Sequence, residues 1–226
     1  IACGIFCLVK DKFQDIIWVG TDGQGVYMYF TDAFSIQNTL LNTPAYQINN
    51  PVRALFLDNE QTLWIGTTGN GILRMLKYTP EKGKQTATER LLTNNSALTD
   101  NSVYCFTPSR WKRLWIGTES GINYYSYQER KLKQFPVTAG GKAVKYVHSI
   151  CEQNDSTLWI STVGEGIVKV SLNTSSGIPT IKDAERTVLD GGKRASNYFF
   201  ISFQENDSIL WFGNRGYGAY RINTET

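Results

Sequence analysis

The stretch Leu63-Trp64-Ile65-Gly66-Thr67 is one of five copies of a tryptophan-centred motif in this chain of 226 residues. The other copies are centred on Trp18, Trp115, Trp159 and Trp211. The last two copies are altered, because Ser161 replaces the glycine in one and Asn214 replaces the threonine in the other. Successive tryptophans stand 46, 51, 44 and 52 residues apart. A period of this length indicates a repeat protein whose units stack against one another.

The residues around each tryptophan predict four short strands per copy. Upstream lies a pair of apolar residues three positions apart, and these pairs are Ile5 and Leu8, Val52 and Leu55, Val103 and Phe106, Val147 and Ile150, and Phe200 and Phe203. A polar turn and then the tryptophan follow, as in a strand, a hairpin and a second strand. Downstream comes a glycine turn such as Gly23-Gln24-Gly25, which allows positive φ at a bend. A third strand follows, and a weaker fourth is predicted near Phe34 to Leu41, Arg90 to Thr93, Leu132 to Val137 and Arg186 to Leu189.

Four antiparallel strands per repeat are typical of a propeller blade. We therefore predict an all-β fold, a β-propeller in which residues 1–226 form a single partial domain with 19 strands. The predicted blades span approximately residues 5–42, 52–94, 102–138, 146–190 and 199–226, and the last lacks its outer strand. We expect either a fragment of a seven-bladed propeller that lacks about two blades, or association of the exposed blade faces.

The tryptophans and the cysteines receive structural roles in this arrangement. Trp18, Trp64, Trp115, Trp159 and Trp211 are predicted to lie between neighbouring blades, where burial of an indole contributes a few kcal/mol. A column of small residues on the innermost strands suits the place where blades converge, and it consists of Cys7, Ala54, Cys105, Ser149 and Ser202. The four cysteines are expected to be buried thiols, with one disulfide as the alternative.

Composition excludes several classes of function. The net charge is +3 and only 19% of residues are charged, so no basic stripe for nucleic acid is present. No run of 18 apolar residues is present, so this segment is not expected to span a membrane. His148 is the single histidine and no CxxC pair occurs, so no metal site and no cofactor are expected.

The repeat resembles a known family. Its tryptophan motif, the aspartate upstream of it (Asp58 in the second copy) and the segment Leu98-Thr99-Asp100-Asn101-Ser102-Val103 are similar to the two-component regulator propeller repeat. All five copies share the resemblance, which therefore covers essentially the whole chain. Ser109 and Gln153 depart from the pattern, because each stands where the family has the turn aspartate.

The resemblance implies a sensor. In that family the repeat builds periplasmic sensor domains of hybrid two-component systems in gut Bacteroidetes, which are ectodomains of inner-membrane histidine kinases and respond to oligosaccharides. It implies an oligosaccharide ligand, signalling across the membrane to transcriptional control, a homodimeric receptor, and contact with the remaining blades of the same propeller. The chain contains no H-box and no nucleotide-binding glycine boxes, so no enzyme activity is expected of this segment itself.

Candidate ligand-binding residues lie where the chain enters each inner strand and at the glycine turns, because loops on a rigid scaffold commonly carry binding. The second residue of the inner strand differs from blade to blade, and it is Phe6, Arg53, Tyr104, His148 and Ile201 in turn. The chosen candidates are Arg53, Tyr104, His148, Asn50, Asn101, Lys145, Tyr146, Asn197, Tyr198, Arg215 and Tyr217. Gln24 and other polar residues of the glycine turns are further candidates. Aromatic rings can stack on sugar rings, and forked polar groups can bind hydroxyls.

Two other functions remain open from the sequence. A propeller enzyme, for example a lyase, would need convergent acids, bases and metal ligands on one face, which the lone histidine and scattered carboxylates do not supply. A protein-docking scaffold would use the same variable loops to bind another protein.

Overall fold

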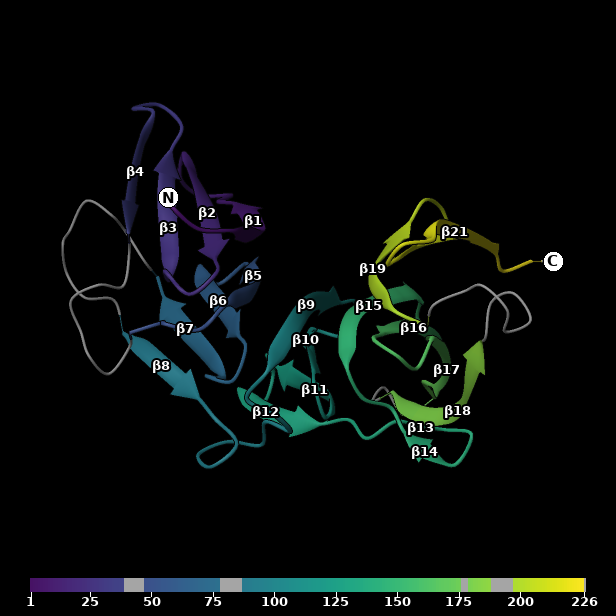
Figure 1. The fold of residues 1–226 in the computed structure, drawn as a ribbon. Coiled ribbons are helices and arrows are strands. Elements are labelled where there is room, and N and C mark those ends of the chain that lie inside the picture. The colour runs from purple at the N-terminus through teal and green to yellow at the C-terminus, as the bar shows by residue number, and fades with distance from the viewer. Residues whose placement is uncertain (39–46, 78–86, 176–178, 188–196, 226) are drawn as a thin grey trace. The chain divides into compact units, whose positions relative to one another are not determined.

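The computed structural model describes residues 1–38, 47–77, 87–175, 179–187 and 197–225, and their regular secondary structure consists of β-strands (Figure 1). Five sheets of three or four strands follow one another along the described part of the chain, and within each the strands pair in chain order as an antiparallel meander. These sheets are the predicted blades, so the β-propeller fold is confirmed.

The strand bounds follow the repeat. The first blade consists of β1 (Ile5–Lys10), β2 (Ile16–Thr21), β3 (Val26–Phe30) and β4 (Ser35–Asn38). The second consists of β5 (Val52–Leu57), β6 (Thr62–Thr67), β7 (Ile72–Leu76) and β8 (Thr88–Leu91). The third consists of β9 (Val103–Ser109), β10 (Arg113–Thr118), β11 (Gly121–Ser126) and β12 (Lys131–Gln134). The fourth consists of β15 (Val147–Asn154), β16 (Thr157–Thr162), β17 (Ile167–Asn173) and β18 (Thr180–Thr187), and the fifth of β19 (Phe199–Gln204), β20 (Ile209–Asn214) and β21 (Gly218–Asn223).

The chain divides into two compact units, residues 1–104 and 105–226. The first unit holds the first two blades, and the second holds most of the third blade together with the fourth and fifth. In the first unit, Trp18 of the first blade packs in one apolar cluster with Val52 and Ile65 of the second. The prediction that tryptophans lie between neighbouring blades is therefore confirmed here.

The second unit repeats this packing twice. Trp115 of the third blade lies in one cluster with Val147 and Ile160 of the fourth. Trp159 of the fourth blade in turn packs with Phe199 and Phe212 of the fifth. Trp211 on the fifth blade is only half-buried. The first, third and fourth blades therefore each pack their tryptophan face on the blade that follows.

Each of these five indoles donates a hydrogen bond through Nε1 to an acidic or amide side chain. The acceptors are Asp11 for Trp18, Asp58 for Trp64, Glu152 for Trp115, Gln153 for Trp159 and Glu205 for Trp211, at 2.6–2.9 Å. Ser109 stands at the turn position of the third blade, and its hydroxyl accepts a hydrogen bond from the Trp111 amide at 3.1 Å. Glu152 of the following blade takes its place, so the departure noted in the sequence has a structural compensation.

The glycines of the second strands allow close approach to the innermost strand. A Cβ placed on Gly20 would lie 2.4 Å from Sγ of Cys7, and one on Gly117 would lie 2.5 Å from Sγ of Cys105. Such distances leave no room for a side chain, so the small column is confirmed at both cysteines. None of the four cysteines forms a disulfide.

The fifth blade differs from the sequence-based register by one residue. Ile201 lies opposite Gly213, as Ala54 lies opposite Gly66 in the second blade. Ile201 therefore occupies the column assigned to Ser202, and Phe200 is the second residue of this inner strand. The apolar pair was wrongly taken as Phe200 and Phe203, because three neighbouring phenylalanines made the pattern ambiguous.

Two further predictions were wrong in detail. The described residues form 21 strands instead of 19, because β13 (Thr138–Ala139) and β14 (Lys142–Ala143) make a small hairpin before the fourth blade. The outer strand β18 begins at Thr180, six residues before the predicted start. The predicted blade ends at residues 42 and 190 lie outside the described residues.

Candidate functional site

Two candidate residues of the first unit take part in local contacts at the entry to the inner strands. The guanidinium carbon of Arg53 lies 3.8 Å from the centre of the Phe6 ring on the neighbouring inner strand. Both side chains are exposed. Asn50 instead donates from Nδ2 to the carbonyl oxygen of Thr68 at 2.8 Å, which fixes the adjacent glycine turn.

Asn101 and Tyr104 lie at the end of the first unit. The Asn101 side-chain oxygen accepts a hydrogen bond from the Thr93 amide at 3.0 Å, and its carbonyl accepts one from the Gly71 amide at 2.8 Å. Asn101 therefore orders the loop between two blades. Tyr104 is half-buried.

The second unit carries exposed or partly exposed aromatic side chains on its fourth and fifth blades. We call Tyr146, His148, Tyr198 and Phe200 the aromatic surface. The rings of His148 and Phe200 meet edge to face at 5.0 Å. Val163 joins the two tyrosines through the backbone, since its amide donates to the Tyr146 carbonyl and it forms a β-bridge with Tyr198.

The glycine turn of the fifth blade borders this surface. The amide of Arg215 donates to the carbonyl of Tyr198 at 3.0 Å. Tyr217 follows in the same turn, and its side chain is 53% exposed. Tyr146, Tyr198 and Phe200 are 40–43% exposed, so together with Tyr217 four large rings face solvent at the start of β15 and β19 and in the glycine turn. Phe200 was missed by the register error, although Phe199 stands 12 residues before Trp211, the spacing found in three other blades.

Lys145 and Asn197 have mainly structural contacts. The amide of Lys145 donates to the Glu165 carboxylate at 3.3 Å, and Arg186 binds the same carboxylate at 2.9 Å. The carbonyl of Asn197 accepts hydrogen bonds from the amides of Gly164 and Gly166. These contacts hold the glycine turn of the fourth blade against the incoming chain.

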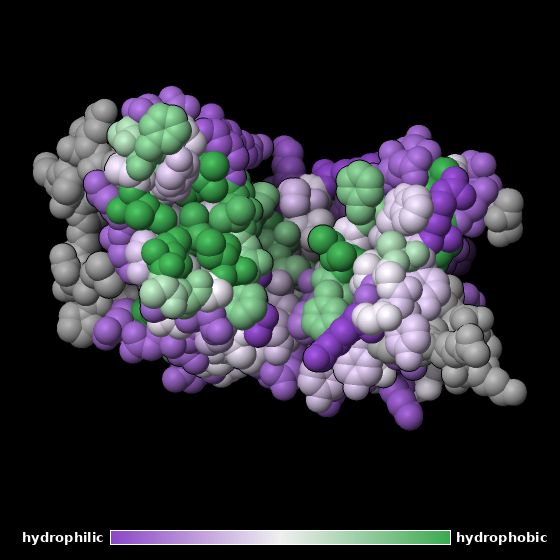
Figure 2. All heavy atoms as spheres, turned by 45° about the horizontal axis from the view of Figure 1, so that its top comes forward, coloured by the Kyte–Doolittle hydropathy of each residue, from purple (hydrophilic) through white to green (hydrophobic). Residues whose placement is uncertain are grey.

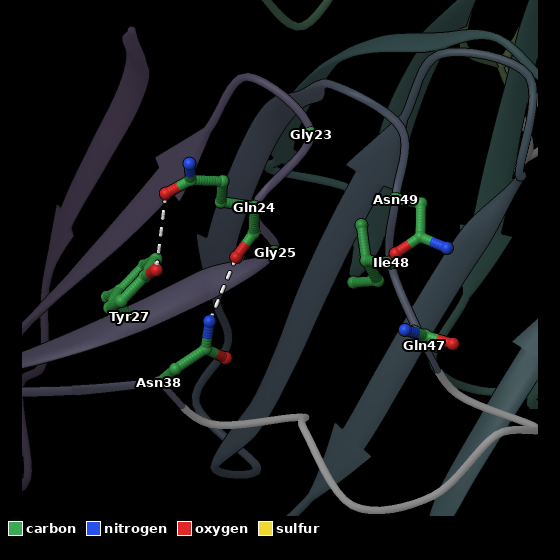
Figure 3. A pocket seen from close by; sticks show the side chains of 8 residues that line it. All are labelled: Gly23, Gln24, Gly25, Tyr27, Asn38, Gln47, Ile48 and Asn49. Carbon is green, nitrogen blue, oxygen red and sulfur yellow. Dashed lines mark hydrogen bonds between the residues drawn. The ribbon is translucent and has the colours of Figure 1, made fainter. Parts of the chain in front are cut away.

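The first unit also contains a pocket of about 260 Å³ that the sequence did not indicate as a site (Figure 3). Its lining residues come from the glycine turn, from β3 and β4, and from the segment before the second blade: Gly23, Gln24, Gly25, Tyr27, Asn38, Gln47, Ile48 and Asn49. In Figure 3, Gln24, Tyr27 and Asn38 lie on one side, and Gln47, Ile48 and Asn49 lie on the other. Of these residues, only Gln24 was a candidate.

Hydrogen bonds order one wall of this pocket. Asn38 Nδ2 donates to the Gln24 carbonyl at 2.9 Å, and the Tyr27 hydroxyl donates to Gln24 Oε1 at 3.4 Å. Gly23 has a φ of 78°, and a Cβ on it would lie 3.1 Å from the Asn49 carbonyl. A side chain there would be strained and would press on the opposite wall.

The described residues hold little that suggests catalysis by thiols or metals. Burial raises the pKa of the Cys7 and Cys105 thiols to about 12 and that of Cys151 to about 11, so these thiols are protonated at neutral pH. Across the described ranges, no group of three or more His, Cys, Asp or Glu side chains could hold a metal ion. The same part of the chain contains no helix that is long and apolar enough to cross a membrane.

Comparison with known proteins shows which family the repeat matches. The family described as "Two component regulator propeller" matches residues 46–69 and 97–120, which are the tryptophan motifs of the second and third blades with the segments before them. Histidine kinase P4 of Formosa agariphila is 29% identical over 166 residues, which are 72% of this chain and 12% of that protein. The chain therefore spans a small part of this curated relative.

Solved structures share the fold. The extracellular domain assigned to the hybrid two component system BT3049 of B. thetaiotaomicron matches 98% of this chain and 34% of its own, with a TM-score of 0.61 and 18% identity. PorZ, a surface component of the type-IX secretion system of Porphyromonas gingivalis, matches 97% of this chain and 32% of its own, with a TM-score of 0.70 and 14% identity. The resemblance inferred from the motif is confirmed: the chain is a β-propeller chain in which residues 46–69 and 97–120 match the two component regulator propeller family.

Proposed function

We propose that the chain is a ligand-sensing part of an extracytoplasmic receptor of the hybrid two-component type, and that its ligand is an oligosaccharide. The family repeats and the similarity to a histidine kinase support the sensing role. The propeller fold of an extracellular domain of such a system is consistent with a periplasmic position. The segment itself binds and does not catalyse, and the kinase chemistry belongs to other parts of the receptor.

The observation that carries the proposal is the aromatic surface with its neighbour Tyr217. Exposed aromatic rings offer flat apolar area for the faces of sugar rings at low conformational cost. Arg215 adds a forked donor beside them, which suits carboxylate or sulfate groups as well as hydroxyls. A bound saccharide that favours one arrangement of paired receptors would shift their population and so transmit the signal.

Calorimetric titration with a panel of neutral and acidic oligosaccharides tests this function. We expect at least one to bind, and we expect Tyr198→Ala to weaken that binding about tenfold or more, because stacking area is lost. Phe34→Ala is the matched control, because Phe34 is an exposed ring on a turn of the other unit. Absence of binding by every oligosaccharide, or equal binding by Tyr198→Ala and the wild type, would contradict the proposal.

A further inference from the structure

A small hairpin, β13–β14, precedes the fourth blade and leads directly to the aromatic surface. Of the described segments that lead into blades, only this one contains a hairpin. Ala139 pairs with Lys142 around the turn Gly140-Gly141, whose two residues have positive φ as a tight hairpin turn requires. The strands lie beside β18 (Figure 1). Tyr146 of the aromatic surface follows a few residues later, so the hairpin borders that surface along the chain.

Apolar packing fixes the base of the hairpin. Ala139 and Val144 are 1% and 2% exposed, and they lie in the cluster that also contains Trp115 and Val147. The Val144 amide donates to the Val137 carbonyl at 2.9 Å. The core of the second unit therefore determines where this hairpin stands.

A single guanidinium joins the hairpin to the glycine turn of the fourth blade. Arg186, near the end of β18, donates from Nε to the Ala139 carbonyl at 3.2 Å. Its Nη2 donates to the carbonyls of Lys142 and Ala143 at 3.4 Å. Its Nη1 donates to the Glu165 carboxylate at 2.9 Å. Because the donors of a guanidinium form a rigid fork, these contacts fix the hairpin in one position beside the turn.

The same contacts leave two lysine side chains without a counter-charge. The Glu165 carboxylate accepts hydrogen bonds from Arg186 and from the backbone amide of Lys145. Lys142 and Lys145 have exposed side chains, and in the described part of the chain neither ammonium group forms an ion pair or a hydrogen bond. Because Arg186 offsets the charge of Glu165, both lysines present positive charge beside the aromatic surface.

Positive charge predominates around the aromatic surface. In the described glycine turns and strand entries of the second unit, with the neighbouring Arg186, the cations are Lys142, Lys145, Arg186 and Arg215, and the acids are Glu119 and Glu165. A net positive charge attracts anionic ligands and repels cationic ones. Aromatic rings beside this charge suit a ligand that combines sugar rings with anionic groups.

We propose that the β13–β14 hairpin is the charge-selecting edge of the saccharide site, so that the preferred ligand is an oligosaccharide with carboxylate or sulfate groups. The sugar rings stack on the aromatic surface, and Lys142 and Lys145 bind the anionic groups. Arg186 is a positioning residue, because it acts through the hairpin that it holds. The proposal deepens the proposed function and rests on it for the saccharide class of the ligand.

Calorimetric titration with matched acidic and neutral probes tests this selection. Oligogalacturonides carry a carboxylate on each ring and are compared with their methyl esters, and carrageenan oligosaccharides carry sulfates and are compared with their desulfated forms. We expect at least one acidic probe to bind about tenfold or more tightly than its neutral form. A rise in salt from about 0.05 M to about 0.5 M should reduce the difference, because exposed charges are screened. Failure of both acidic probes to bind more tightly than their neutral forms would overturn the proposal.

Substitution of the two lysines tests which residues select the charge. Lys142→Gln combined with Lys145→Gln is expected to weaken binding of the acidic probe about tenfold and to leave binding of its neutral form unchanged. Lys131→Gln is the control, because Lys131 is exposed and pairs with Ser126, at the end of β11 that lies away from the glycine turn. A loss of equal size with Lys131→Gln would assign the effect to net charge and would overturn the proposal.

Arg186→Lys tests the positioning role, because it keeps the positive charge and removes the fork. We expect the preference for the acidic probe to fall about threefold or more, although Lys142 and Lys145 are still present. Hydrogen exchange of the Val144 amide should become faster in the same variant, because the hairpin is held less firmly. Faster exchange with an unchanged preference would overturn the positioning role.

The outcomes separate this edge from the proposed function. Binding of acidic and neutral oligosaccharides with equal affinity through Tyr198 overturns the edge and leaves the proposed function in place. A preference for acidic probes that the two lysine substitutions remove and Tyr198→Ala does not change supports the edge and contradicts the aromatic surface. Polyglutamate of matched length that binds as tightly as the acidic saccharides, with the same dependence on the lysines, would overturn the saccharide class.

Discussion

At the scale of single residues, the three cysteines on inner strands make the stability of the fold depend on pH. Their thiols lie where neighbouring blades converge, and burial is the main cause that raises the pKa of Cys7 and Cys105 to about 12 and of Cys151 to about 11. The ordinary value is 9.0. In the unfolded chain these thiols ionise above about pH 9, whereas in the folded chain they remain protonated.

This difference predicts a loss of stability in alkali. The free energy of unfolding is expected to be unaffected by these thiols below pH 9 and to fall as pH rises above it, because the unfolded state then releases protons that the folded state keeps. For Cys105 the expected loss is about 1 kcal/mol at pH 10. Urea unfolding at pH 8 and pH 10 measures it, and Cys105→Ala should show a smaller drop between the two pH values than the wild type. An equal drop in Cys105→Ala and in the wild type would contradict a raised pKa of the Cys105 thiol.

Residue-level features of the fold were largely predictable from the sequence. The tryptophans and the small column follow from repeated spacing, because every blade solves the same packing problem at the same position. Ile201 shows where this reasoning ends: consecutive phenylalanines satisfy the apolar pattern in two registers, and only ladder pairing with Gly213 selects one. A slip of one residue moves every side chain to the opposite face of a strand.

At the scale of elements, Glu152 on β15 joins the third and fourth blades. Its carboxylate accepts hydrogen bonds from Trp115 Nε1 at 2.8 Å and from the Arg110 amide at 2.9 Å, and the side chain is buried. The acceptor that other blades take from their own hairpin is thus supplied here by the neighbour. This interface therefore depends on a polar contact as well as on apolar packing.

Removal of this carboxylate is expected to destabilise the second unit. Glu152→Ala leaves the buried Trp115 indole without its acceptor and also removes the partner of the Arg110 amide, at a cost of about 2–3 kcal/mol. Urea unfolding followed by tryptophan fluorescence measures the change. Glu152→Gln keeps one acceptor oxygen and should cost less. Glu129→Ala, at an exposed glutamate, is the control, and equal losses at residues 129 and 152 would contradict this role.

The candidate sites were less predictable than the blades. The sequence directed attention to residues at strand entries, and several of these, such as Asn50 and Asn197, hold glycine turns in place. The pocket of the first unit combines a turn, an outer strand and a later segment, and no periodic pattern brings Asn38 and Asn49 together.

At the scale of the whole molecule, two apolar blade faces are exposed, and they are of the two kinds that pack together inside each unit. One is the face of the first blade that carries Leu8. Leu8 lies opposite Val19 in its ladder as Ile150 lies opposite Ile160, so the two residues are equivalent. Ile150 is 3% exposed beneath the preceding blade, whereas Leu8 is 62% exposed. Figure 2 shows a hydrophobic patch over this first blade.

The other exposed face belongs to the fifth blade. It carries Ile201, Phe203 and the half-buried Trp211, and Phe203 pairs with Trp211 in the ladder. Inside each unit, a tryptophan face packs on the face equivalent to that of Leu8. The two exposed faces are therefore complementary in kind, and each can accept a blade face of the other kind.

Residues 1–226 are accordingly expected to self-associate head to tail as concentration rises, because large exposed apolar patches mark association surfaces. Sedimentation measurements across a concentration series test this expectation. Leu8→Glu and Phe203→Glu should each weaken association about tenfold or more, since a carboxylate would have to be buried in the contact. Phe34→Glu adds the same charge at a turn residue that is 82% exposed and should leave association unchanged. Equal weakening by all three substitutions would assign the effect to net charge and would contradict a specific pairing of blade faces.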